Sequence, residues 1–379
     1  MRINIPYFVT VIIAVLFVVV GHNIVVQDAL LFQNAAHDIV RADVVRIVER
    51  HDLGEGFDDF MDFHGSIIIF EARITRGERR GAIVTASQSS GDFALGELKE
   101  VEEGDTVLLV YNEFIGEWFL DGYLRTNRLL ALAIVFMLSI LIFGRKKGFN
   151  TILSLALTCG AVFGVFIPAI LAGKNIYVMS LLVCAYVIAM TLLLVVGFNK
   201  KALAAAVGCA SGLAVTGIIA VIMDRALFLT GLVDGNSRFL VNLQGAVTLD
   251  LRAIIFAGII IGAMGAIMDV ALSISSSLWE IKEKARSVNF ETLFRSGLNI
   301  GRDIIGSMAN TLVLAYIGTS LSVVLLLTVY SDSLFSLLNQ EMIVVEILQS
   351  LSGILGILFA MPLTAFFCAI LYVRHKEHW

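Results

Sequence analysis

The sequence predicts an α-helical polytopic membrane protein with about eight transmembrane helices and one small β domain. Of its 379 residues, 58% are hydrophobic and only 16% are charged, and the mean hydropathy is +0.89. Soluble domains are less apolar and more charged, so this excess of apolar side chains is expected to face lipid. The β domain is predicted because residues 34–123 interrupt the apolar runs with mixed charges and short strand-like segments.

The first apolar run, from Ile5 to Val20, follows Arg2. It is short enough for a cleavable signal peptide, but Gly21-His22-Asn23 is not a small-x-small cleavage site. We therefore expect residues 1–26 to form a retained signal-anchor helix, with a cleaved signal peptide as the alternative.

Residues 34–123 are predicted to form an OB-like β-barrel between the first and second membrane helices. Strand-like runs separated by turn signals lie at Ala42–Val48, Ser66–Ile74, Gly81–Thr85 and Thr106–Tyr111. The segment is acidic overall, which argues against a nucleic-acid groove. Its histidines, His37, His51 and His64, match no metal-ligand spacing, so no metal site is predicted.

Residues 128–379 are predicted to form a seven-helix membrane domain. The expected spans are 128–143, 150–171, 176–198, 202–223, 253–279, 307–330 and about 349–373. Lys and Arg gather after the first, third, fifth and last of these spans, on the same side as Arg2. By the positive-inside rule, both termini are expected in the cytoplasm and residues 34–123 outside the plasma membrane.

Two connecting segments carry more apolar residues than ordinary loops do. Residues 224–252 are expected to be a re-entrant or interfacial segment over the mouth of the bundle, with Asp234, Asn236 and Arg238 at its capping turn. Residues 282–302 are amphipathic and are expected to lie along the cytoplasmic membrane surface.

One predicted span carries polar and small residues along a single face. On a helix that turns about 100° per residue, these residues fall within roughly 80° of one another; they are Gly258, Gly262, Gly265, Asp269, Ser273, Ser276 and Glu280. The glycines are expected to allow close helix packing, and a packing seam alone is the simpler interpretation. A carboxylate in hydrocarbon costs about 2.5 to 3.5 kcal/mol, so Asp269 is expected to face protein or water.

The next span has a polar face of its own, made by Ser307, Asn310 and Thr311 together with Asp303. An intramembrane Asn seeks a hydrogen-bond partner for the same reason as the Asp. We therefore expect the two polar faces to meet, with Asp269 and Asn310 lining one cavity. Asp269, Ser273, Ser276, Ser307, Asn310 and Thr311 form the predicted binding site for a small ion or solute.

Three stretches carry a family resemblance: GLVDGNSRFLVNLQG, GAMGAIMDVALSISSSLWEI and NIGRDIIGSMANTLVLAYIGTSL. With them, residues from about 150 to 373 resemble the YibE/F-like family of bacterial multi-spanning membrane proteins. The resemblance implies the polytopic topology and makes the two polar helices the centre of the family. It implies no substrate and no reaction.

Transport or channel activity is the favoured function, because an intramembrane carboxylate with nearby hydroxyls suits a cation or proton. The alternative is a membrane sensor or accessory protein that uses the β domain for recognition. An enzyme is not expected, since HExxH, GxSxG, a phosphate loop and paired catalytic acids are all missing from the sequence. The four cysteines show no CxxC spacing, and no cofactor is predicted. The expected partners are the bilayer and a small ion or solute, with a homo-oligomer or a partner subunit left open and nucleic acid excluded.

Overall fold

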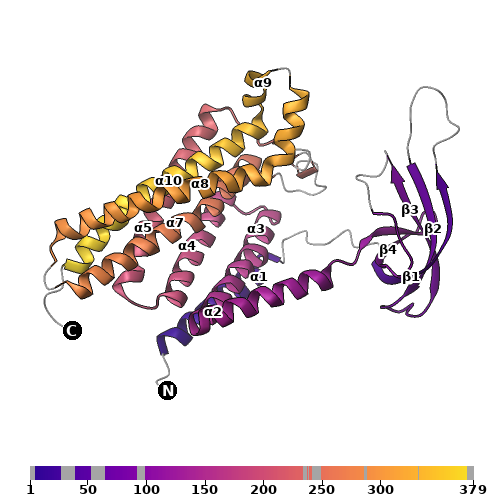
Figure 1. Cartoon of the computed structure of the whole chain (residues 1–379), viewed down its shortest axis with the longest axis horizontal. Coiled ribbons are helices and arrows are strands. Elements are labelled where there is room, and N and C mark those ends of the chain that lie inside the picture. Colours follow the sequence, from indigo (N-terminus) through magenta and orange to yellow (C-terminus); the bar gives the residue numbers. More distant parts are fainter. Residues whose placement is uncertain are drawn as a thin grey trace. The chain divides into compact units, whose positions relative to one another are not determined.

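The computed structural model describes residues 5–26, 39–52, 65–91, 99–233, 237, 239–240, 249–285, 288–331 and 333–373. The chain divides into two compact units (Figure 1). One contains Met1–Leu31 and Ile140–Trp379, and the other contains Phe32–Ser139. The second unit therefore holds the β domain and the beginning of the helix that follows it.

The β unit is a closed five-stranded barrel with strand order β1-β2-β3-β5-β4, which confirms the predicted small barrel. The strands are β1 (Ile39–Asp52), β2 (Gly65–Ile74), β3 (Ile83–Gly91), β4 (Thr106–Asn112) and β5 (Glu117–Tyr123). β5 follows the last of the four predicted strand-like runs and was not predicted from the sequence. Its Trp118 is buried in the barrel core with Ile68, Phe70 and Leu109, because alternate strand residues point inward.

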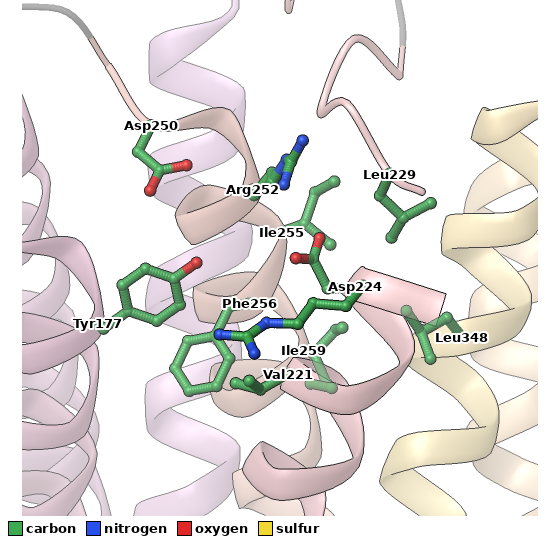
Figure 2. A pocket seen from close by; sticks show the side chains of 12 residues that line it. Tyr177, Val221, Asp224, Leu229, Asp250, Arg252, Ile255, Phe256, Ile259 and Leu348 are labelled. Carbon is green, nitrogen blue, oxygen red and sulfur yellow. The ribbon is translucent and has the colours of Figure 1, made fainter. Parts of the chain in front are cut away.

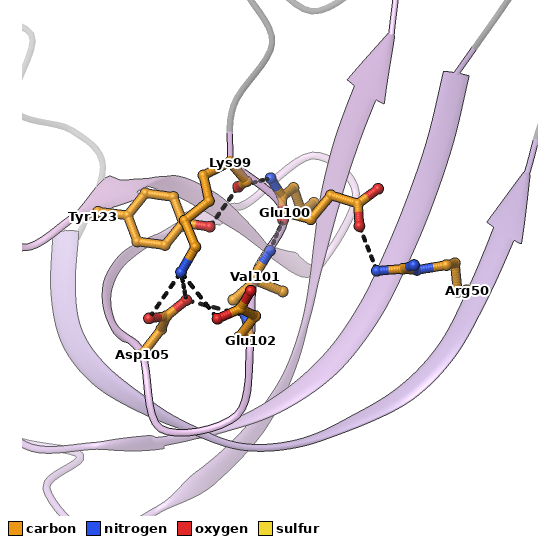
Figure 3. Close-up of polar contacts among 8 residues, drawn as sticks. Arg50, Lys99, Glu100, Val101, Glu102, Asp105 and Tyr123 are labelled. Atoms are coloured by element: carbon orange, nitrogen blue, oxygen red, sulfur yellow. Dashed lines mark hydrogen bonds and ion pairs between the residues drawn. The ribbon is translucent and has the colours of Figure 1, made fainter.

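Charged side chains hold the segment that leads into β4 (Figure 3). The Lys99 ammonium lies 3.1 Å from Asp105 and 3.3 Å from Glu102. The Asp105 carboxylate also accepts a hydrogen bond from the Glu102 backbone N–H at 3.0 Å. Lys99 is thus a cation whose charge two neighbouring carboxylates already balance.

The helices are α1 (Ile5–Val26), α2 (Thr126–Ala161), η1 (Val162–Phe166), α3 (Ile167–Leu171), α4 (Ile176–Val195), α5 (Lys200–Ala226), α7 (Leu251–Lys284), α8 (Phe290–Tyr330), α9 (Leu334–Leu338) and α10 (Glu341–Val373). In the described part of the chain, seven helical segments are long and apolar enough to cross a membrane. The sequence predicted about eight spans. The difference arises at Thr126–Leu171. This stretch of 46 residues is counted as one segment, but it contains two of the predicted spans and a kink between them.

That long run is broken at Arg145, whose backbone is not helical (φ 49°, ψ −125°). Close to the break, a Cβ atom on Gly148 would lie 2.3 Å from the carbonyl oxygen of Ile140. Only glycine fits so close an approach of two backbone segments. The predicted spans 128–143 and 150–171 are therefore the two arms of one bent helical run.

α5, α7 and α10 pack together around the apolar core of the helical unit, and α4 and α8 flank them. α5 and α10 pack closely. A Cβ on Gly212 would lie 2.6 Å from the Ala360 Cβ, and one on Gly356 would lie 2.0 Å from the Thr216 hydroxyl. Small residues let these two helices approach each other in this way.

α8 is one helix of 41 residues, about 60 Å long at 1.5 Å per residue. The part of the predicted surface segment from Phe290 to Arg302 is the beginning of this helix. This part belongs to α8 and packs on the bundle, where a Cβ on Gly297 would lie 2.6 Å from the Ala365 Cβ. The first turns of α8 are amphipathic because their apolar side packs on α10, where Phe290 also contacts Phe366.

Candidate functional site

α7 has two contrasting faces. Ile260, Ile267, Ile274 and Leu278 are completely buried in the core. On the opposite side lies the α7 polar face, defined as Gly258, Gly262, Gly265, Asp269, Ser273, Ser276 and Glu280. All of these residues are exposed on the chain except Ser276, which is half-buried. The helical spacing read from the sequence therefore separates the two faces correctly.

Among the described residues, a close contact is found at only one of the three glycines. At Gly262 the Tyr316 hydroxyl oxygen lies 2.8 Å from the Cβ position. In the same part of the chain, the Gln349 side chain lies 3.7 Å from a Cβ built on Gly258, and no atom lies within 4 Å of one on Gly265. α7 turns its large apolar side chains toward α5 and α10, so its glycine side is left as exposed backbone.

Contacts at two levels fix how α8 runs antiparallel along α7. Gly297 of α8 lies beside Leu278 of α7, and Tyr316 of α8 lies beside Gly262 of α7. Interpolation between these contacts places Ser307 level with Asp269, and Asn310 within one turn of that level. The two predicted polar groups thus lie at nearly the same level along the helices.

The predicted α8 residues are nevertheless not bonded to Asp269. Ser307, Asn310 and Thr311 are exposed, like Asp269 itself. The Thr311 hydroxyl donates to the Ser307 carbonyl oxygen at 2.9 Å. In the described ranges no hydrogen bond or ion pair joins Asp269 to Asn310. The chain places the two polar faces at one depth, but it does not enclose them together.

A groove of about 730 Å³ opens between the last turns of α7 and the beginning of α8. Ser276, Glu280 and Lys284 line its α7 side, and Ile300 lines its α8 side. Ser307 and Thr311 follow Ile300 by seven and eleven residues. At about 100° per residue, the three side chains leave the helix axis in directions within about 40° of one another, so they lie on one side of α8. Asp269 precedes Ser276 by seven residues and continues the α7 side in the same way. The groove therefore points along both helices toward the level of Asp269.

Three further polar groups lie near the other end of the α7 polar face. The Gln349 amide lies near Gly258, and the Tyr316 hydroxyl lies at Gly262. Glu346 of α10 lies close enough to Tyr316 for its carboxylate to influence the Tyr316 hydroxyl electrostatically. One of its carboxylate oxygens is buried without a hydrogen-bond partner among the described residues.

Glu346 lies before the last predicted span, which was expected to begin at about residue 349. The structure starts α10 at Glu341, so Glu346 lies inside the helix. The apolar run around it, from Met342 to Leu348, was the signal that could have identified it.

Not every hydroxyl of α7 belongs to the polar face. Ser275 is completely buried, and its hydroxyl donates to the Lys201 carbonyl oxygen at 2.8 Å. It also lies 2.8 Å from the Tyr372 hydroxyl. This serine joins α5, α7 and α10, and its role is structural.

A second cavity, of about 440 Å³, lies at the opposite end of the helical unit (Figure 2). Tyr177, Asp224, Asp250 and Arg252 border it, above an apolar floor that includes Phe256, Ile259 and Leu348. One Asp224 oxygen is buried and has no partner within the described ranges. The floor joins the apolar core, so this cavity is separated from the α7 polar face. The predicted cap, Asp234, Asn236 and Arg238, lies outside the described residues.

Metal ligands do not converge in the part of the chain that the structure describes, where no group of three His, Cys, Asp or Glu side chains is suitably placed. Cys184, Cys209 and Cys368 are buried free thiols, and Cys159 is exposed. The candidate site therefore rests on carboxylates, hydroxyls, amides and exposed backbone.

Several long apolar helices around an apolar core, with a carboxylate midway along one of them, are typical of a helical membrane protein. The model of the family described as YibE/F-like protein matches residues 132–374, well over half of the chain. The chain belongs to this family, as the resemblance indicated. In the other two comparisons, no curated protein and no solved structure matched it.

Proposed function

We propose that this membrane protein moves a small ion or solute along the α7 polar face, with Asp269 as the site midway. The observation that carries the proposal is the sequence of polar groups along α7. Gln349, Tyr316 and Glu346 lie near its beginning, Asp269 and Ser307 share its middle level, and a groove lined by Ser276 and Glu280 lies at its end. Polar groups at successive depths are what an ion needs to replace its hydration shell.

The path is proposed along this face because the centre of the bundle is apolar and closed. Ile260, Ala263, Ile267 and Ile274 have no exposed surface, and they lie between α7 and its neighbours α5 and α10. An ion crossing there would meet mostly apolar side chains. The buried hydroxyls of Thr216, Ser275 and Thr364 already donate hydrogen bonds to backbone carbonyl oxygens, so that route would be costly. The exposed glycines, by contrast, leave backbone carbonyl groups accessible beside Asp269.

Orientation in the plasma membrane is part of the proposal. Lys200 and Lys282 belong to the same end of the helical unit, since Ser275 bonds to Lys201 less than two turns before Lys282. Positive charges are concentrated at cytoplasmic ends. We assign this end, with the groove, to the cytoplasm, together with both termini, and the barrel to the outside.

The experiment uses the full chain in lipid vesicles. Proton entry is followed with an enclosed pH-sensitive dye, and Na⁺ and K⁺ conductance is measured in planar bilayers. Asp269→Asn should reduce the flux of the transported cation at least about ten-fold, and Asp269→Glu should retain a part of it. The control is Glu291→Gln, which alters an exposed carboxylate paired with Arg295 at the start of α8. Equal flux in Asp269→Asn and the wild type, or no flux of any of the three cations in the wild type, contradicts the proposal.

Recognition by the barrel is the second candidate, with the membrane helices as anchor and signalling body. A specific observation favours it: the barrel has a cavity of about 780 Å³ lined by Arg41, Arg76, Arg79 and Trp118. Deleting residues 34–123 removes the barrel and so distinguishes the transport proposal from the recognition proposal. Cation flux that survives this deletion supports the transport route along α7, whereas loss of a cellular function with the flux intact supports recognition.

A further inference from the structure

Two cavities of the β unit meet at Arg41. One has a volume of about 780 Å³ and the other about 640 Å³, and Arg41, Leu124 and Asn127 line both. They lie where the barrel ends and α2 begins, because Leu124 follows β5 directly and Thr126 is the first residue of α2. Leu129 and Leu132 of α2 line the smaller cavity as well. The site thus combines polar walls with apolar side chains at the start of a membrane-spanning helix.

Five arginines line these two cavities: Arg41, Arg76, Arg79, Arg125 and Arg128. No ion pair to any of the five exists in the described ranges. Lys99, which lines the same region, differs from them because Asp105 and Glu102 balance its charge (Figure 3). Of the other carboxylates in the two linings, only Glu78 remains. Five like charges on adjoining walls repel one another unless an anion lies between them.

Arg41 gives the cluster a buried donor that nothing satisfies. Its Nε atom is buried and has no hydrogen-bond partner among the described residues. A buried polar group without a partner is uncommon and needs a physical explanation. Guanidinium groups offer several donors in a planar arrangement that matches the oxygens of a phosphate.

Arg79 is held in place by the aromatic side chains of the barrel. Its guanidinium carbon lies 5.8 Å from the ring centres of both Tyr111 and Trp118. Trp118 also lines the larger cavity. An anion bound between the arginines would therefore change the electrostatic surroundings of the Trp118 indole.

From this geometry we infer that the five arginines around Arg41 form a binding site for a phosphate group. The inference is independent of the proposed transport function, since it concerns the β unit alone. The phosphate group belongs either to an anionic lipid headgroup, whose chains would lie along Leu129 and Leu132, or to a free phosphate.

The test uses the full chain in nanodiscs of phosphatidylcholine. Tryptophan occurs three times in the sequence, at Trp118, Trp279 and Trp379. Replacing Trp279 and Trp379 by Phe leaves Trp118 as the only tryptophan, which can be excited selectively at wavelengths that tyrosine does not absorb. Inorganic phosphate is titrated in one arm, and discs with increasing phosphatidylglycerol are compared in the other. We expect a saturable change in Trp118 emission in at least one arm.

Arg41→Gln should raise the half-saturation concentration about ten-fold, because the variant loses a charge-assisted hydrogen bond to the phosphate. Arg76→Gln, at an exposed residue, tests the cluster without altering the buried donor. Arg80→Gln is the matched control, because Arg80 lies in the same exposed turn but does not line either cavity. Saturation by inorganic phosphate identifies a free phosphate site, and a response to phosphatidylglycerol alone identifies a lipid headgroup site. No saturable change in either arm, or an equal effect of Arg80→Gln and Arg76→Gln, overturns the inference.

Discussion

Tyr316 of α8 reaches across to Gly262 of α7, where its hydroxyl oxygen lies 2.8 Å from the position that a Cβ would take. This contact fixes the level of α8 against α7 and thereby places Ser307 beside Asp269 in depth. It also explains why Gly262 differs from Gly265, which has no neighbour within 4 Å of such a Cβ.

Glycines of the helical unit should differ in their tolerance of alanine. At Gly212, a Cβ would meet Ala360 at 2.6 Å and the Gly356 carbonyl oxygen at 2.9 Å. Gly212→Ala should therefore destabilise the protein by about 1 to 3 kcal/mol through overpacking. Gly265→Ala has open space and should be neutral or stabilising by up to about 1 kcal/mol, because alanine favours the helix.

The two variants are compared by thermal unfolding in the same detergent. A Gly265→Ala protein as unstable as Gly212→Ala would mean that something contacts the α7 polar face tightly, such as a second copy of the chain.

The groove between α7 and α8 predicts a specific cross-link. Ser276 and Ile300 line it from opposite sides, so Ser276→Cys with Ile300→Cys should be joined by a short bifunctional thiol reagent. The exposed native thiol of Cys159 is first replaced by serine. Ser276→Cys with Gly306→Cys serves as the control pair, since Gly306 has no neighbour within 4 Å of its Cβ position. Denaturing gel mobility measures the product, and equal cross-linking of both pairs would contradict the register of α8.

The barrel should lose stability in acid through Glu71. Its carboxylate forms a two-pronged ion pair with the Arg46 guanidinium at 2.6 and 2.9 Å. The hydrogen bonds from Arg46 lower the pKa of Glu71 below its ordinary value of 4.5. A carboxyl group whose pKa is lower in the folded state stabilises the fold above its unfolded pKa and loses this contribution as pH falls.

Unfolding of the barrel, followed by Trp118 fluorescence, should therefore become easier as pH decreases below about 4.5. Glu71→Gln should be less stable at neutral pH and show a shallower dependence between pH 5 and 3. Because this pair is largely exposed, the effect should be small and should weaken in high salt. An identical pH profile in Glu71→Gln would exclude Glu71 as the titrating group.

The buried hydroxyl pair of Ser275 and Tyr372 should stabilise the helical unit. Tyr372→Phe removes one partner of a 2.8 Å hydrogen bond in a completely buried position. We expect a loss of about 1 kcal/mol in the free energy of unfolding. Tyr330→Phe, at a highly exposed residue of α8, should change it little. Equal effects of both substitutions, measured by chemical unfolding, would rule out a special role for the pair.

Composition and periodicity were sufficient for much of this protein. Apolar runs long enough to span a bilayer identified the membrane helices, and charged segments with short β-rich runs identified the barrel. The spacing along residues 258–280 separated the polar face of α7 from its buried face. Each of these follows from local regularities: side chains repeat every 3.6 residues in a helix and alternate in a strand.

Other features needed the tertiary structure, because they depend on which surfaces meet. The sequence could not reveal that Gly212 and Gly356 lie in close helix contacts whereas Gly265 does not. It also could not bring Glu346 and Tyr316 to the α7 polar face, or gather Arg41, Arg76 and Arg125 at one end of the barrel. Residues far apart in the chain become neighbours only when the apolar faces of the helices pack against one another. Composition and periodicity thus predict the kinds of element and the position of a carboxylate within a long apolar helix, whereas packing decides what lies beside that carboxylate.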